Sequence, residues 1–281
     1  MQVKIYGSKE HQKTGPLAHF REMLADLRQA QYLAVRFAIR DIKGMYRQSV
    51  LGILWAFIIP AVNTLVWIML RSSGIVSFEH EGLPYVVYVF SGTMLWAVFT
   101  ESLLAPLVET TANKSILSKI NFPKEGLIIA GFYKLLFNTG IKILLILVMM
   151  LAHGIYPNSN IILFPLALMV MIVTGFALGL LLAPVGLLYT DIGKGLPIFM
   201  QLFMYLSPVI YLVPPEGTLR TIMTLNPVTP LLSNCRNWLM GLPGEFLPYF
   251  IAISMIMFVF LLIGWFFYRL SIPVIVERAS Q

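Results

Sequence analysis

Four basic side chains at regular spacing are the first candidates for chemistry in this sequence. They are separated by four, three and four residues and comprise Arg36, Arg40, Lys43 and Arg47. A helix turns about 100° per residue, which gathers these charges within roughly 60° of one face. Such a face binds anions, above all the phosphates of lipid headgroups. The spacing therefore predicts an amphipathic helix on an anionic membrane surface; the alternative is the solvated face of a soluble helix.

Residue patterns typical of an active centre are missing from the sequence. The stretch nearest to a phosphate-binding loop, YTDIGKG at 189–195, lacks the G-x-x-x-x-G-K-[ST] spacing. The histidines are scattered, without the pairing typical of a zinc site. The single cysteine, Cys235, cannot form a disulfide within the chain. We expect no catalytic residue, no metal site and no cofactor on this chain.

A polar stripe runs through one otherwise apolar segment. Lys134, Asn138 and Lys142 are spaced by four residues and share one helix face. A lysine near the middle of a bilayer costs about 2.5–3.5 kcal/mol on insertion scales, so Lys142 needs a reason to be there. Two interpretations are open. Either Lys142 pairs with an acid such as Glu101 while Lys134 reaches the inner headgroups, or Lys142 lines a pore.

A second apolar segment combines aromatic rings with polar groups. Its polar members are Gln201, Tyr205 and Ser207, and the neighbouring rings are Phe199, Phe203 and Tyr211. Aromatic residues in a membrane span commonly pack against other helices or sit at the interface. Rings with amide and hydroxyl groups also suit a surface over which sugars slide, because sugar rings have apolar faces and hydroxyl edges. Both interpretations stay open from the residues alone.

The elements that position these groups are membrane helices. The chain of 281 residues is 58% hydrophobic and only 12% charged, with a mean hydropathy of +0.80. Soluble domains carry about 25% charged residues. The segments long and apolar enough to cross a bilayer are 51–70, 84–105, 127–152, 161–188, 196–213 and 247–268.

The distribution of basic residues predicts the orientation of these spans. An even number of spans leaves both termini on one side. With the N-terminus inside, fifteen Lys and Arg residues flank the spans on the inner side and three on the outer side. Because cytoplasmic loops are enriched in Lys and Arg, both termini are expected in the cytoplasm.

Two connecting segments have structure of their own. The stretch ETTANKSILSKINFPKE at 109–125 predicts a short cytoplasmic helix, which is either a solvated connection or a docking element for a cytosolic partner. On the outer side, TLRTIMTL and PLLSNCRNWLM are semi-apolar but too short to span the membrane. They predict short re-entrant helices before the last span, or an ordinary structured loop.

The sequence therefore predicts an all-α integral membrane protein with six transmembrane helices. We expect a cytoplasmic tail at 1–15, an amphipathic interface or gate helix within 16–49, a transmembrane domain at 50–270 and a second cytoplasmic tail at 271–281.

Several stretches, taken in order, resemble a known family. They are RDIKGMYRQSVLGILWAFIIP, PYVVYVFSGTMLWAVF, NKSILSKINFPKEGLIIA, LLYTDIGKGLPIFMQLFMYLSPVIY and LNPVTPLL. Over about residues 25–270 the chain resembles the membrane subunit of type-2 ABC exporters, in the branch that moves O-antigen, capsule or teichoic-acid polysaccharide. One departure is YTDIGKG, where such proteins often carry an arginine before the aspartate.

The resemblance implies a half-transporter in the bacterial inner membrane. Two copies form a channel and two separate ABC ATPase subunits, which hold ATP and Mg, drive the export of lipid-linked polysaccharide; no nucleic acid is involved. The channel-lining residues implied are Trp55, Phe199, Gln201, Phe203, Tyr205, Tyr211 and, as a further candidate, Lys142. The lipid-pyrophosphate or gate residues implied are Arg36, Arg40, Lys43 and Arg47.

The same resemblance implies a surface that couples the chain to its ATPase. The coupling residues are Asn113, Lys114, Lys119, Phe122 and Pro123. Two rival functions stay in view. A type-2 exporter of drugs or lipids shares this fold, and a membrane glycan-modifying enzyme is a different class that needs reactive groups this sequence lacks.

Overall fold

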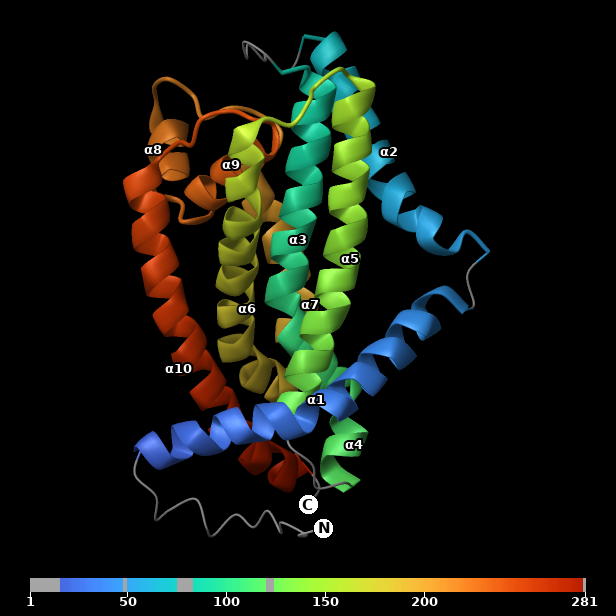
Figure 1. The fold of residues 1–281 in the computed structure, drawn as a ribbon, viewed down its shortest axis with the longest axis vertical. Helices are drawn as coiled ribbons and strands as arrows, with labels where there is room; N and C mark the ends of the chain where they lie inside the picture. The colour runs from blue at the N-terminus through green and yellow to red at the C-terminus, as the bar shows by residue number, and fades with distance from the viewer. Residues whose placement is uncertain (1–15, 48–49, 75–82, 120–123, 280–281) are drawn as a thin grey trace.

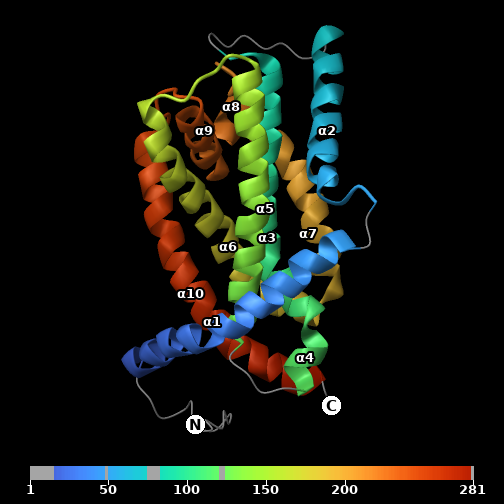
Figure 2. The same ribbon diagram turned by 45° about the vertical axis from the view of Figure 1, so that its right-hand side comes forward.

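The computed structural model describes residues 16–47, 50–74, 83–119 and 124–279, and every regular element in these ranges is helical (Figures 1 and 2). The α-helices are α1 Pro16–Arg47, α2 Trp55–Ser72, α3 Tyr85–Ala112, α4 Lys114–Lys119, α5 Glu125–Ala152, α6 Phe164–Leu188, α7 Thr190–Phe203, α8 Thr218–Leu225, α9 Val228–Leu239 and α10 Leu247–Ala279. Short 3-10 turns are η2 Gly52–Leu54, η3 Ser159–Leu163 and η4 Met204–Leu206. The expected all-α class is confirmed.

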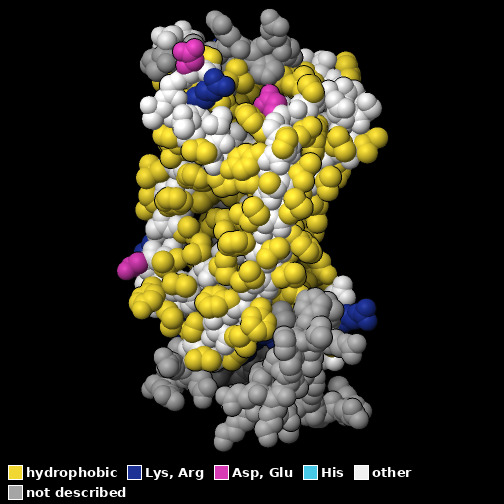
Figure 3. Space-filling view, turned by 90° about the vertical axis from the view of Figure 1, so that its left-hand side faces the viewer, with side chains coloured by type: hydrophobic (Ala, Val, Ile, Leu, Met, Phe, Trp, Pro, Cys, Tyr) yellow, Lys and Arg dark blue, Asp and Glu magenta, His cyan; other side chains and the backbone are white. Residues whose placement is uncertain are grey.

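Four helical segments in the described ranges are long and apolar enough to cross a membrane: Tyr85–Ala112, Glu125–Ala152, Ser159–Leu188 and Leu247–Ile275. They stand side by side as the body of the molecule (Figures 1 and 2). On the face shown in Figure 3, hydrophobic side chains cover most of the height, with few charged side chains between the ends. Because hydrocarbon solvates such a surface and water does not, the structure is that of a multi-pass membrane protein.

The first and fifth expected spans differ from the helices observed. The apolar part of α2, Phe57–Ser72, is shorter than the four long helices. The expected span 196–213 is not one helix, because α7 ends at Phe203 and η4 ends at Leu206. Ser207 then has extended backbone angles, φ −126° and ψ 150°. Pro208 explains this break, because proline disfavours a helical conformation in the residue before it.

Helix α3 forms the centre of the bundle and packs against α2, α5 and α6. Small residues bring α3 and α6 close together. A Cβ at Gly175 would collide with the Ser102 hydroxyl, and one at Gly179 would collide with the Leu103 carbonyl oxygen. Within a membrane, association depends on such close packing, because lipid tails solvate apolar side chains as well as a neighbouring helix does.

Helix α1 crosses one end of the bundle at an angle and packs mainly against α5 (Figures 1 and 2). Its buried stripe is Ala30, Ala34 and Ala38, none more than 4% exposed. The amphipathic helix is confirmed, but its apolar residues Val35 and Ile39 stay exposed. Small alanines pack against α5 because they let the two backbones approach closely, as bulkier side chains do not.

The two ends of the bundle carry different elements. α1, α4 and the C-terminal part of α10 lie at one end, and α8 and α9 lie at the other (Figure 1). α10 continues through the expected tail as far as Ala279. The expected outer half-helices correspond to α8 and α9, and every residue of α9 is buried.

Candidate functional site

Most side chains of helix α7 are exposed. Met200 is its only buried residue in the described structure. Phe199 is 57% exposed and stacks on Phe203, with 5.7 Å between ring centres and 14° between ring planes. Gln201 is also exposed. An apolar helix that leaves an amide uncovered has a face suited to water or a partner rather than to lipid.

The aromatic group continues beyond the end of α7. Tyr205 is 40% exposed and lies 6.2 Å from Trp67 of α2, measured between ring centres. The Tyr211 hydroxyl donates a hydrogen bond to the Tyr205 carbonyl oxygen. The Phe203 ring packs against the ring of Trp96 of α3, with 5.9 Å between ring centres. The structure therefore brings five of the expected channel residues, Phe199 to Tyr211, together along α7 and the segment after it.

The other two expected channel residues, Trp55 and Lys142, meet at a different place. They line one pocket between α2, α3 and α5, and no residue of α7 is among its lining residues. Lys142 donates hydrogen bonds to both carboxylate oxygens of Glu101, at 2.7 and 2.8 Å. The pairing interpretation is therefore confirmed. Lys134 pairs with Glu109 of α3, and its reach to the inner headgroups stays a prediction.

The basic stripe on α1 is exposed, as its spacing predicts. The Arg36 guanidinium donates to the Tyr32 hydroxyl at 3.1 Å and lies over that ring. Lys43 and Arg47 are exposed. Arg40 is different, because its guanidinium donates to Asp41 at 2.7 Å and to the Asn113 side-chain oxygen at 3.2 Å. Arg40 therefore already has partners that a phosphate would have to replace.

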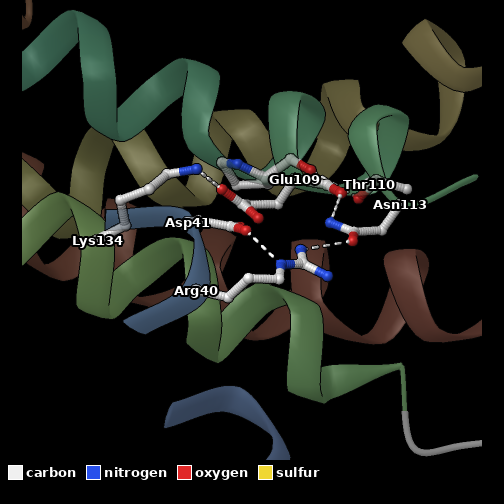
Figure 4. A network of polar contacts seen from close by, with 7 residues as sticks. Arg40, Asp41, Glu109, Thr110, Asn113 and Lys134 are labelled. Carbon is white, nitrogen blue, oxygen red and sulfur yellow. Dashed lines mark hydrogen bonds and ion pairs between the residues drawn. The ribbon is translucent and has the colours of Figure 1, made fainter. Parts of the chain in front are cut away.

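Figure 4 shows the polar network that joins α1 to the junction of α3 and α4. The side chain of Asn113 is buried and donates to the Glu109 carbonyl oxygen at 2.9 Å. The Asn113 carbonyl oxygen accepts hydrogen bonds from the backbone N–H groups of Ile116 and Leu117, both at 3.0 Å. Asn113 therefore starts α4 and, through Arg40, attaches it to α1.

The expected coupling residues are only partly within the described structure. Lys114 is exposed on α4, and Leu117 is buried beneath it. Phe122 and Pro123 lie outside the described residues, as does the side chain of Lys119. The α4 surface is small, exposed and basic at Lys114, which is what a docking element for another protein requires.

A buried charge cluster at the α1 end was missed by the sequence. Arg269 of α10 donates to Glu125 of α5 at 2.6 Å and to Asp26 of α1 at 2.7 Å. The side chains of Asp26, Glu125 and Arg269 are 3%, 5% and 13% exposed. The cluster joins three helices. A signal was present, since isolated charges at the ends of apolar segments commonly have partners.

A buried arginine at the opposite end was also missed. The Arg236 guanidinium donates to the carbonyl oxygens of Pro208 and Val209, both at 2.9 Å, and lies 3.8 Å from the centre of the Tyr88 ring. Burial lowers the pKa of this guanidinium from its ordinary value. These bonds satisfy carbonyl groups that the helix break at Pro208 leaves without partners.

The exposed side chains described above are suited to binding. Among the described residues, no three His, Cys, Asp or Glu side chains gather as metal ligands would. Burial raises the pKa of the Cys235 thiol above its usual range, and the thiol is 0% exposed, so it stays protonated and inert. The exposed groups are instead rings, amides and basic side chains.

A helical membrane bundle with an amphipathic helix at one end and an exposed polar and aromatic helix is an architecture that suits a membrane transport subunit. Residues 32–237 match the model of the ABC-2 type transporter family. The chain belongs to this family, whose members are the membrane subunits of transporters.

Curated relatives point to one branch of the family. The chain is 24% identical to the O-antigen export system permease protein RfbA of Myxococcus xanthus over 216 residues, which cover 75% of this chain and 82% of that protein. It is 21% identical to the protein of the same name from Klebsiella pneumoniae over 213 residues, 74% of this chain and 80% of that protein. The chain is therefore an ABC-2 type permease that is similar to O-antigen export permeases.

Proposed function

We propose that this chain is the permease subunit of an ATP-driven exporter of lipid-linked polysaccharide. Two copies form the channel and two ABC ATPase subunits bind on the cytoplasmic side. In this arrangement six segments cross the membrane, with α2 and the α7 segment among them, and both termini are cytoplasmic. The names of the relatives, which are O-antigen export permeases, support the polysaccharide as cargo.

The observation that carries the channel proposal is the exposed face of α7. Gln201 and Tyr205 are four residues apart and both exposed, so they offer an amide and a ring on neighbouring positions, and Phe199 adds a second exposed ring. A sugar needs both kinds of contact, because its ring faces are apolar and its edges carry hydroxyls. Individually weak, repeated contacts let a polymer slide, whereas a deep, tight site would hold it.

Labelling α7 tests this channel directly. Cysteine at Gln201 or Tyr205, modified with a bulky maleimide, should block export, because the label fills the path. The native Cys235 is buried, so it adds little background to the reaction. The measurement is surface polysaccharide in cells that carry each variant at equal membrane levels.

The matched control is cysteine at Phe258 of α10, which is 58% exposed on an apolar helix. The same label there should leave export unchanged, because that site faces lipid. Full export from cells labelled at Gln201 and Tyr205 would place the path elsewhere. Loss of export after labelling at Phe258 would show that the label acts through general damage.

The α4 surface should be required for binding the ATPase. Changing Lys114→Glu together with Lys119→Glu reverses the charge of the proposed docking helix and should reduce the recovery of the ATPase with the permease. Arg28→Glu, on the exposed surface of α1, is the control with the same type of charge change. Equal ATPase recovery from all variants by affinity purification from membranes would contradict coupling through α4.

A further inference from the structure

A pocket of about 340 Å³ lies between α2, α3 and α5, away from the exposed face of α7. Its apolar wall includes Trp55, Ile59 and Pro60 of α2. Its polar wall is formed by Glu101 of α3 with Asn138 and Lys142 of α5. Ligand sites commonly occupy about 300–1,000 Å³, so this pocket is at the small end of that range.

The polar wall retains hydrogen-bonding capacity after its internal ion pair is formed. Lys142 uses two of its N–H groups on Glu101, and the Glu101 side chain is still 39% exposed. Each carboxylate oxygen has a further lone pair, and the ammonium has a third N–H. The Asn138 amide makes no hydrogen bond to any residue that the structure describes. Donors and acceptors are therefore offered side by side.

This mixture of donors and acceptors selects the chemical class of the ligand. An anion would use the donors but meet the Glu101 carboxylate, and a cation would meet the Lys142 ammonium. A hydrocarbon chain would leave the Asn138 amide and the remaining hydrogen-bonding capacity of the Lys142–Glu101 pair without partners, which is costly inside a membrane. Hydroxyl groups both donate and accept, so a neutral group with several hydroxyls satisfies the wall.

The apolar wall narrows the class further, to a sugar ring. Trp55 is 47% exposed and lines the same pocket as the polar residues Glu101, Asn138 and Lys142. Sugar rings stack their C–H faces on aromatic rings while their hydroxyls bind polar groups at the edge. We infer that this pocket binds one neutral sugar unit of the lipid-linked substrate, an inference that rests on the proposed function.

The pocket also reaches the end of α1. Met45 of α1 lines it, whereas Lys43 and Arg47, two residues to either side, project from the opposite face of that helix. The pocket is large enough for one short terminal unit of the substrate but too small for a polymer to pass through. It therefore recognises the substrate, whereas α7 lines the path along which the polymer moves.

Photo-crosslinking of the full chain in lipid nanodiscs tests the pocket. The probes are diazirine-bearing dodecyl glycosides of glucose, galactose and mannose; dodecanol and dodecanoic acid with the same diazirine are the sugarless and anionic comparisons. At least one glycoside should label peptides containing residues 45–60, 97–101 or 138–142 more than either comparison does. The corresponding free monosaccharide should compete with it.

Variants distinguish binding from general damage. Asn138→Leu should reduce glycoside labelling by about three- to tenfold, the range expected for one hydrogen-bonding group. Trp55→Leu and the pocket-filling Ile141→Trp should reduce it as well, whereas Trp265→Leu on α10 should not. Ile141→Trp leaves Asn138 and the Lys142–Glu101 ion pair unchanged. Reduced labelling in this variant would therefore reflect a filled pocket and not a disrupted fold.

Equal labelling by dodecanol, stronger labelling by dodecanoic acid, or unchanged labelling in Asn138→Leu and Ile141→Trp would each overturn the sugar site. The export test of α7 is independent, because crosslinking needs neither ATP nor transport. Failure of crosslinking with export still blocked at Gln201 removes only the pocket inference. Surface polysaccharide that persists in cells lacking this chain removes the proposed function itself.

Discussion

Replacing Arg269 with methionine should release α1 from the bundle. The guanidinium bonds to both Asp26 and Glu125, and both carboxylates are nearly buried. Without it, Asp26 and Glu125 would lose the guanidinium that bonds to both of them. Breaking a buried ion pair on one side commonly costs about 3–5 kcal/mol. That corresponds to roughly a hundredfold or more in the equilibrium between docked and undocked α1.

The measurement is the reactivity of a cysteine at Ala34, which is 0% exposed in the stripe that packs against α5. Maleimide should modify this position rapidly in the Arg269→Met background and slowly otherwise. Arg28→Met, a neutralisation at an exposed position of α1, should have no effect. Asp26→Asn with Glu125→Gln should restore much of the protection in Arg269→Met, because neutral groups tolerate burial better than unpaired charges. Unchanged reactivity in Arg269→Met would show that the alanine stripe alone holds α1.

Replacing Arg236 with leucine should strongly destabilise the end of the bundle that carries α8 and α9. The change removes two hydrogen bonds to the carbonyl oxygens of Pro208 and Val209, together with the contact on Tyr88. Hydrogen bonds to a charged group contribute about 1.5–3 kcal/mol each. We therefore expect a loss of about 3–5 kcal/mol in the free energy of unfolding, measured as a lower thermal midpoint in nanodiscs.

Two milder variants separate the contributions at this site. Arg236→Lys should recover only part of the stability, because a single ammonium does not reproduce the two-pronged geometry of guanidinium. Tyr88→Phe keeps the ring beneath Arg236 but loses the hydroxyl, which donates at 3.2 Å to Pro208 and Tyr211. Its cost should be about 1 kcal/mol. Equal midpoints for Arg236→Leu and Tyr88→Phe would mean that the carbonyl contacts of Arg236 contribute little.

Several features of this protein follow from the sequence alone. The long apolar runs predict the helices α3, α5, α6 and α10, and steps of three and four residues predict the basic face of α1. The family resemblance is confirmed by the match over residues 32–237. These features are local, because the transfer of a continuous apolar segment into lipid depends on the residues within that segment.

The partners of the charged groups were decided only by the tertiary structure. Lys134 lies on the same stripe as Lys142, yet one pairs with Glu109 and the other with Glu101. Five of the expected channel residues lie along α7 and the segment after it, whereas Trp55 and Lys142 line the pocket between α2, α3 and α5. This division likewise depends on how α2 packs against α3 and α5. Spacing along one helix gives the direction of a side chain and leaves open which neighbouring helix it faces.

The same holds for the residues that the sequence did not identify. Arg236 was expected in an outer loop, and it is buried because α9 packs into the bundle beside the break at Pro208. Arg269 and Asp26 are 243 residues apart in the chain, and they meet because α1 crosses the end of α10. A buried charge is stable only where the folded chain supplies its counter-charge or its carbonyl acceptors, so its position depends on the packing of helices distant in sequence.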